Sequence, residues 1–302
     1  MMPPFNQSWS IAEAAQLACL IEAAAPKVGN VHPGATFSDM QFGHFVSSAT
    51  VSQSVLQAAE NATVGSLVLR WTQATQQRVG RNTNLGTILL LAPIAVAARE
   101  TPELPATAAR KTNATTLQQS VASVLAGLSP TDCEQVYEAI RTANPGGLGQ
   151  QPTSDVSNAP GESLVSAMSR VADIDAVARQ YTNNYADIFE HLLPCLNKSL
   201  ETALDPLHAI VGLQLQWLAH EPDGLIARKL GLDFAKQVQQ RAQRVLEDEP
   251  SIENWLQCSR EIPLPVREFD SFLRADGHRR NPGTTADLIA CTLFCRFLLG
   301  PQ

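Results

Sequence analysis

The chain has 302 residues, of which 44% are hydrophobic and 17% are charged, and its formal net charge is −7. This length is enough to bury a large core, and the low charged fraction argues against a disordered chain. The acidic balance excludes the broad basic face that duplex nucleic acid requires. An anionic ligand would therefore need a local basic cluster.

The sequence carries no sign of export or membrane insertion. Its six cysteines form no C-x-x-C pair, which favours buried thiols in a reducing compartment. The most apolar segment, 85–98, is shorter than a membrane-spanning helix and contains Pro93. The first nine residues hold no positive charge, unlike a secretion signal. We therefore expect a cytoplasmic protein that binds neither membranes nor nucleic acid.

Helical periodicity runs through nearly the whole chain. Ser10 and Glu13 have the spacing of a capping box at the start of the first expected helix. Apolar residues recur at intervals of three and four in later segments, which include 64–71, 85–98, 164–171, 207–218, 225–230, 233–249 and 288–299. No segment shows the alternation typical of strands. We expect an all-α fold, a single domain over residues 1–302 that forms a bundle of about a dozen helices.

One long irregular segment interrupts the helices at 143–161, where Pro145, Pro152 and Pro160 stand among several glycines. A loop of this length inside a compact domain is usually functional or disordered, and it could also link two helical halves. We expect an active-site loop in which Gly146 and Gly147 approach a phosphate. A flexible turn is the simpler interpretation, because the segment lacks the strand and the lysine of a Walker loop.

Two polar turns that contain glycine each lead into an apolar helix. The first spans 80–86 and the second spans 281–287. The unpaired N–H groups and the positive end of the dipole at such a helix start suit a phosphate chain. The candidate phosphate-binding residues are Arg81, Asn82, Thr83, Asn84 and Gly86 in the first turn, and Asn281, Gly283, Thr284 and Thr285 in the second. Alternatively these are ordinary helix caps, with Thr284 and Asp287 as a second capping box.

Two further segments place basic residues near turns. Lys27 follows the helix-ending Pro26, beside Gly29 and Asn30, and we expect it to extend from a loop toward a ligand phosphate. A solvated lysine is the alternative. In the segment that starts at Asp223, a short helix ends with Arg228 and Lys229, which either clamp a ligand with Asp223 or simply oppose the negative end of the dipole.

Five carboxylates are candidates for holding Mg²⁺, which usually binds one or two protein carboxylates together with substrate phosphates. They are Glu22, Asp39, Asp187, Glu190 and Asp287, and the pattern does not choose among them. We assign Asp187, Glu190 and Asp287 to the metal. The histidines fit no zinc spacing.

Five motifs occur in an order that resembles the triphosphoribosyl-dephospho-CoA synthase family. The motifs are Ala24-Ala-Pro-Lys-Val-Gly-Asn-Val31 with Phe37-Ser-Asp-Met40, Gly80-Arg-Asn-Thr-Asn-Leu-Gly86, Pro145-Gly-Gly-Leu-Gly149, Asp223-Gly-Leu-Ile-Ala-Arg-Lys229 and Asn281-Pro-Gly-Thr-Thr-Ala-Asp-Leu288. The resemblance covers about 12–299. It implies an all-helical enzyme that transfers the triphosphoribosyl group of ATP to 3′-dephospho-CoA and releases adenine.

This reaction would need three groups of residues. Lys27, Arg81, Arg228, Lys229 and the two helix starts would hold the triphosphate together with Mg²⁺. Glu22 or Asp39 would take the proton of the acceptor hydroxyl. Asn82 and Asn84 would donate hydrogen bonds to the departing purine.

The chain also departs from the family pattern, since Val28 stands where the family often has proline, and residues 281–285 and 227–229 differ from the citrate-lyase branch. The acceptor could therefore differ, as in a branch linked to tetrahydromethanopterin-dependent one-carbon metabolism. A non-catalytic scaffold that binds nucleotide is a third interpretation. The sequence leaves a homodimer open.

Overall fold

The computed structural model describes residues 4–101, 114–143, 163–247, 252, 255–257 and 261–301. Most of the expected loop at 143–161, with its candidate residues Gly146 and Gly147, lies outside the described residues. Within the described ranges, no helix combines the length and the apolar character needed to cross a membrane.

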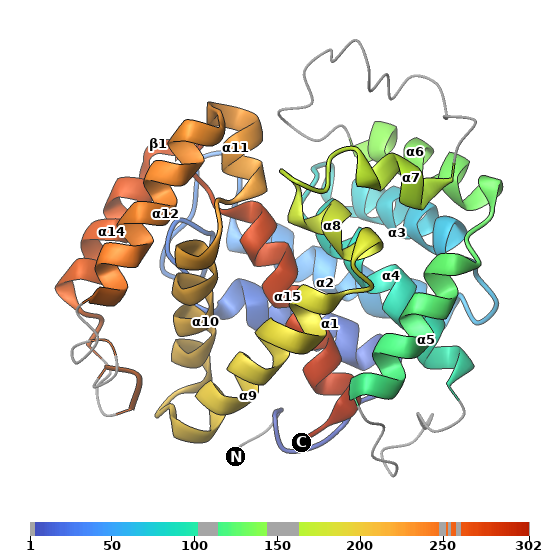
Figure 1. Cartoon of the computed structure of the whole chain (residues 1–302), viewed down its shortest axis with the longest axis horizontal. Helices are drawn as coiled ribbons and strands as arrows, with labels where there is room; N and C mark the ends of the chain where they lie inside the picture. Colours follow the sequence, from blue (N-terminus) through green and yellow to red (C-terminus); the bar gives the residue numbers. More distant parts are fainter. Residues whose placement is uncertain are drawn as a thin grey trace.

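The expected all-α fold is confirmed (Figure 1). The first half contains α1 (Ile11–Ala24), α2 (Phe42–Gln57), α3 (Val64–Val79), α4 (Leu85–Glu100), α5 (Ala114–Ala126) and α6 (Pro130–Ala143). The second half contains α7 (Leu164–Ser169), α8 (Ala176–Thr182), the π-helix η1 (Asp187–Leu192), α9 (Leu193–Thr202), α10 (Pro206–His220), α11 (Gly224–Leu230), α12 (Leu232–Glu247), α14 (Leu264–Arg274) and α15 (Gly283–Leu299). The extended segment β1 covers only Ala275–His278.

Several helix ends follow directly from local sequence. Ser10 and Glu13 form the expected capping box at the start of α1. Gly231 ends α11 with a positive φ of 91°, a conformation that glycine adopts without a steric penalty. Asp223 and Asp175 cap the starts of α11 and α8 through backbone N–H groups.

The C-terminal helix α15 is the central helix of the bundle, with α1, α4, α9 and α10 packed around it (Figure 1). Nearly all of its residues from Thr284 to Leu299 are buried. A helix that is apolar on all sides is stable only in the interior, so its sequence alone favours this position. Most residues of α4 are buried in the same way, around Pro93.

Two apolar clusters make up the core. The larger one surrounds α15 and α4. The smaller one joins α10, α11, α12 and α14, and it includes Val28 and Trp255. Because α11 contacts both α12 and the start of α15, the smaller cluster holds α11 and β1 beside the N-terminus of the central helix. This arrangement forms one side of the cavity described next.

Candidate functional site

A cavity of about 650 Å³ brings together most of the residues that the sequence singled out. Its walls come from α1, α2, α3, α4, α6, α7, α8, α11, β1 and the first turn of α15. The candidates that line it are Glu22, Asn30, Asp39, Arg81, Asn82, Thr83, Asn84, Gly86, Arg228, Lys229, Asn281, Gly283, Thr284 and Asp287. This volume lies within the range typical of small-molecule sites.

The N-terminus of α4 opens into this cavity. Asn82, rather than Asn84 or Thr83, caps the helix, since its Oδ1 accepts a hydrogen bond of 3.1 Å from the N–H of Leu85. Thr83 instead pairs with Ser48, with the two hydroxyl oxygens 2.5 Å apart. The side chain of Asn84 is buried against the cavity, and its Nδ2 has no hydrogen-bond partner among the residues that the structure describes. A buried donor without an acceptor costs about 1–3 kcal/mol, so Asn84 is suited to a ligand that brings an acceptor.

Asp287 faces the same helix start from α15. The hydroxyl of Thr87 donates a hydrogen bond of 2.7 Å to Oδ1 of Asp287. The other oxygen lies so close to Gly86 that a Cβ there would be 2.1 Å from Oδ2. Burial is the main cause that raises the pKa of Asp287 to about 7, and the nearby Glu22 adds to the rise. The expected capping box between Thr284 and Asp287 is therefore wrong.

Lys27 differs from the expectation that it extends from its loop toward a phosphate. Its side chain is fully buried, and Nζ lies 2.8 Å from Oε1 of Glu22. Nζ also donates to the backbone carbonyl of Glu22. Lys27 does not line the cavity, whereas Glu22 does. The lysine therefore holds the carboxylate of Glu22 in place at the cavity wall.

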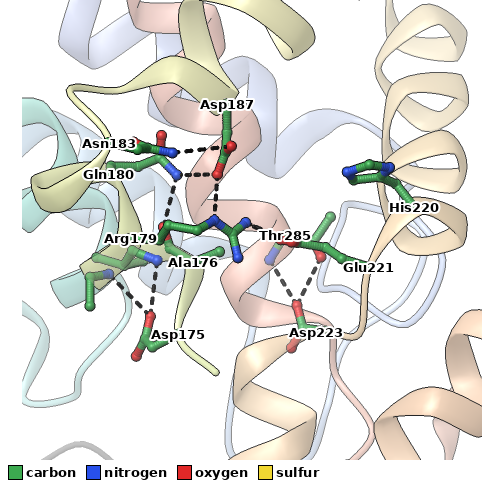
Figure 2. Close-up of polar contacts among 12 residues, drawn as sticks. Asp175, Ala176, Arg179, Gln180, Asn183, Asp187, His220, Glu221, Asp223 and Thr285 are labelled. Carbon is green, nitrogen blue, oxygen red and sulfur yellow. Dashed lines mark hydrogen bonds and ion pairs between the residues drawn. The ribbon is translucent and has the colours of Figure 1, made fainter. Parts of the chain in front are cut away.

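Asp223 and Thr285 join two helices instead of facing a ligand. Oδ1 of Asp223 accepts from the N–H groups of Leu225 and Ile226, at 2.9 and 3.0 Å. Its Oδ2 accepts from both the N–H and the hydroxyl of Thr285, each at 2.8 Å (Figure 2). The expectation that these two residues bind phosphate is not supported, because Asp223 already occupies part of the open start of α15. Burial raises the pKa of Asp223.

The turn at 28–30 is fixed by residues far along the chain. Gly29 has a φ of 71°, and its N–H donates a hydrogen bond of 2.7 Å to Asp270. Gly29 does not line the cavity, so it shapes the turn rather than approaching a ligand. Asn30 does line the cavity, and its Nδ2 donates to Oδ1 of Asn281 at 2.5 Å. Gln214 holds Asn30 in this position through a hydrogen bond of 2.8 Å.

The basic residues of the cavity differ in how they are held. Arg81 is exposed. Arg228 forms an ion pair with Asp175, the capping residue of α8, which the sequence reasoning missed. Lys229 donates a hydrogen bond of 3.1 Å to the backbone carbonyl of His278, and burial lowers the pKa of Lys229. Arg170 also lines the cavity, and the four cations give an acidic protein the local positive cluster that an anionic ligand needs.

Asp39 and His278 pair at the exposed side of the cavity. Oδ1 of Asp39 is 3.1 Å from Nδ1 of His278, and both side chains are more than 40% exposed. Asp39 is therefore much more solvated than Glu22, which is 12% exposed.

The three carboxylates assigned to a metal do not come together. Asp187 accepts hydrogen bonds from the side chains of Arg179, Gln180 and Asn183, and Figure 2 shows these three contacts. Glu190 is exposed and bonds to Gln118. Only Asp287 lines the cavity. The described residues contain no group of three metal-binding side chains, so the three carboxylates assigned to the metal do not form one common site.

An apolar wall completes the cavity, and the sequence reasoning did not predict it. Its side chains include Phe37, Met40, Phe45, Tyr137, Leu164, Met168 and Val171. Phe37 and Met40 stand in one of the motifs, but nothing in their local pattern distinguishes a cavity wall from ordinary core.

The protein is helical, and its cavity is lined by an open helix start, four cations and several carboxylates, a combination that suits an anionic ligand. A sequence model described as ATP:dephospho-CoA triphosphoribosyl transferase matches residues 8–301, so the chain belongs to this family of transferases. Its fold is similar to a crystal structure of a "putative triphosphoribosyl-dephospho-coA synthase" from Archaeoglobus fulgidus. The TM-score is 0.63 at 19% identity, over 84% of this chain and 99% of that one. No curated protein matches the chain significantly.

Proposed function

We propose that this chain transfers the 5-triphosphoribosyl group of ATP to the 2′-hydroxyl of 3′-dephospho-CoA and releases adenine. The chain belongs to this family, and the observation that carries the proposal is a single cavity in which the α4 start meets four basic side chains. The unpartnered amide of Asn84 lies at that helix start. Such a set of donors suits a polyphosphate.

The triphosphate is proposed to lie between the α4 start and the end of α11. Arg81 is exposed and can reach it, and Arg228 and Lys229 approach from the opposite wall. A bound phosphate would compete with Asp175 for Arg228, so binding would exchange one ion pair for another. Asn84 and Asn82 are proposed to contact the purine or the adjacent phosphate.

Glu22 is the stronger candidate for the base that takes the proton of the acceptor hydroxyl. It is nearly buried and fixed by Lys27, whereas Asp39 is solvated and bound to His278. A fixed carboxylate loses less entropy when it meets its proton donor.

Mg²⁺ is expected to enter with ATP, since it usually keeps several waters and binds mainly through substrate phosphates. The described residues hold no group of three metal-ligating side chains, so we assign no protein ligands to the ion and derive no step from it.

Adenine release tests the proposal directly. The purified chain would be incubated with ATP and magnesium, with and without dephospho-CoA, and adenine would be measured by chromatography. Adenine that appears together with an equal amount of triphosphoribosylated product supports the reaction. ADP or AMP as the only nucleotide product would contradict it.

The acceptor could differ from dephospho-CoA, because a position at which this chain departs from the family pattern is linked by hydrogen bonds to the cavity wall. The N–H of Val28 donates a hydrogen bond of 2.8 Å to Gln214, which a proline at this position could not do. Gln214 in turn holds Asn30 at the cavity wall. Adenine release only with an acceptor from tetrahydromethanopterin-linked metabolism would favour a related transferase. A rise in melting temperature with ATP, without any adenine, would favour a non-catalytic scaffold.

A further inference from the structure

Three side-chain amides are joined by hydrogen bonds from the core to the cavity: those of Gln214 on α10, Asn30 in the turn after α1, and Asn281 before α15. Building on the proposed function, we infer that this amide chain fixes Asn281 as a donor to a phosphate oxygen of the ligand. Gln214 is the positioning residue that sets its direction. Each amide has an acceptor oxygen and a donor nitrogen, so the orientation of one dictates that of the next.

The orientation of Gln214 is set by the backbone. Its side chain is fully buried. Oε1 accepts a hydrogen bond of 2.8 Å from the N–H of Val28, and Nε2 donates one of 2.9 Å to the carbonyl oxygen of the same residue. A backbone N–H only donates and a backbone carbonyl only accepts, so the reversed amide would lose both bonds. Gln214 therefore has one stable orientation.

Gln214 in turn sets the orientation of Asn30. Its Nε2 also donates a hydrogen bond of 2.8 Å to Oδ1 of Asn30, whose side chain is buried. The backbone of Pro282 requires the same orientation, because its carbonyl oxygen lies 3.5 Å from Nδ2 of Asn30 and only accepts. The turn is held in place by Arg274, which donates a hydrogen bond of 2.5 Å to the carbonyl of Asn30.

The last link leaves the amide nitrogen of Asn281 for a ligand. Nδ2 of Asn30 donates a hydrogen bond of 2.5 Å to Oδ1 of Asn281, so the oxygen of Asn281 faces the turn. Asn281 lines the cavity. Within the part of the chain that the structure describes, its Nδ2 donates to no protein acceptor. The amide chain thus ends in N–H groups that an acceptor in the cavity can meet.

The charges near Asn281 favour a phosphate oxygen as that acceptor. Lys229 lines the same cavity, and its Nζ donates to the carbonyl oxygen of His278, three residues before Asn281. The positive end of α15 begins at Gly283, two residues after Asn281. An anionic oxygen forms a stronger hydrogen bond with an amide than a neutral one does. A lysine, a helix start and an oriented amide therefore act on one phosphate.

Calorimetric titration with inorganic tripolyphosphate tests the donor, because this probe contains only the phosphate part of the ligand. Asn281→Ala should weaken binding about 10–100-fold, the value of a hydrogen bond to a charged group. Asn197→Ala is the control, since Asn197 is also partly buried but lies on α9 outside the cavity. Unchanged binding in Asn281→Ala would overturn the inference.

A double-mutant cycle tests the link between Asn30 and Asn281. Asn30→Asp keeps the bond from Gln214 but offers Asn281 only acceptors, so Asn281 has to turn its N–H away from the ligand. The new carboxylate also repels phosphate, and this repulsion is present in the Asn281→Ala background as well. Asn30→Asp should therefore weaken binding at least about tenfold more in the wild type than in Asn281→Ala. Equal losses would contradict the amide chain.

Two buried glutamines separate positioning from stability. Gln214 and Gln180 are both fully buried, but Gln180 bonds to Asp187, away from the cavity. In Gln214→Met the amide of Asn30 is free to turn, so tripolyphosphate affinity should fall about two- to tenfold as the share of correctly oriented molecules falls. Gln180→Met should lower the melting temperature and leave affinity unchanged. Gln214→Met should add less than about twofold in the Asn281→Ala background, and a full loss there would overturn the positioning role.

Nuclear magnetic resonance of the side-chain amides reports the orientation directly. The Nδ2 signals of Asn281, identified by their absence in Asn281→Ala, should shift when tripolyphosphate binds to the wild type. In Asn30→Asp the same signals should be shifted before the ligand is added and should then not respond. Wild-type signals that ignore the ligand would overturn the inference, even if Gln214→Met does not fold.

These measurements do not depend on the transfer reaction. If the wild type shows the expected binding and shifts but releases no adenine with any acceptor, the proposed function fails while the roles of Gln214 and Asn281 stand. If adenine is released and Asn281→Ala binds tripolyphosphate and ATP as tightly as the wild type, the inference fails while the proposed function stands.

Discussion

The hydroxyl group of Tyr181 donates a hydrogen bond of 2.7 Å to the carbonyl oxygen of Leu89 in α4. Four residues later, Pro93 lacks the N–H that would otherwise reach this carbonyl. Tyr181 therefore satisfies a buried acceptor that the helix itself leaves open. The contact also ties α8 to α4 next to the cavity, which Leu89 lines.

Tyr181→Phe should lower the free energy of unfolding by about 1–3 kcal/mol, because a buried carbonyl loses its partner. Tyr185→Phe is the matched control. Its hydroxyl donates 2.9 Å to the carbonyl of Leu90, which keeps its helical donor from Ile94, so the loss should be nearer about 0.5–1.5 kcal/mol. Urea denaturation of both variants measures the difference, and identical losses would contradict the role given to Pro93.

Gly86→Ala should impair activity more than stability. The new Cβ would lie 2.1 Å from Oδ2 of Asp287, so the carboxyl must move away from the start of α4. Misplacing a group that lines an active site by about 1 Å can lower the rate about 10²-fold. Adenine release under saturating ATP is the measurement. Gly43→Ala in α2 is the control, because its Cβ would meet nothing within 4 Å. Full activity in Gly86→Ala would show that the position of Asp287 is unimportant.

Lys27→Ala should destabilise the fold by about 3–5 kcal/mol, because it leaves the buried side of Glu22 without its counter-charge. Arg81→Ala should change stability by less than about 0.5 kcal/mol, since Arg81 is exposed, while it weakens ATP binding. Denaturation curves and calorimetric titration with ATP distinguish the two effects. A stable Lys27→Ala variant with weakened ATP binding would restore the sequence-based expectation of a phosphate-binding lysine.

Asp223→Ala should separate α11 from α15. The substitution removes the cap of α11 and leaves the Thr285 hydroxyl and N–H without their acceptor, so we expect a loss above about 2 kcal/mol. Thr285→Val removes only the hydroxyl contact and should cost less. Asp223 does not line the cavity. Under conditions in which the variant is fully folded, its affinity for ATP should therefore equal that of the wild type. A loss of affinity in a fully stable variant would indicate direct ligand contact.

The carboxyl of Asp287 should make the stability of the protein depend on pH in a defined direction. Its pKa is about 7 in the folded protein and 3.8 for an ordinary aspartate, so the folded state binds the proton more tightly. Proton binding to Asp287 stabilises the fold fully below about pH 4. This stabilisation decreases as the pH rises, and the total loss by about pH 7 is at most about 4 kcal/mol. The wild type should therefore lose stability relative to Asp287→Asn across this window.

Denaturation midpoints of the two proteins between about pH 4 and pH 8 test this linkage. A stability difference that stays constant with pH would show that Asp287 is charged in the folded state throughout.

Much of the local structure could be read from the sequence. The capping box at Ser10, the end of α11 at Gly231 and the buried α15 were all predicted, because each depends on residues close to one another in the chain. The polar turns at 80–86 and 281–287 were also correctly singled out as the openings of two core helices. These features follow from backbone geometry and side-chain periodicity, which a local window contains.

The roles of individual polar residues could not be read in this way. Lys27, Asp223 and Asp187 looked like ligand-binding groups, yet each is occupied by partners within the protein, and for Asp223 the partner Thr285 is 62 residues away. Asp175 was not singled out by the sequence, and only the fold shows that it pairs with Arg228. Whether a charged side chain binds a ligand or a neighbour depends on desolvation and on the nearest opposite charge. The sequence alone thus determined an all-helical chain with exposed polar turns, and only tertiary packing decided which of those polar groups remained free to face the cavity.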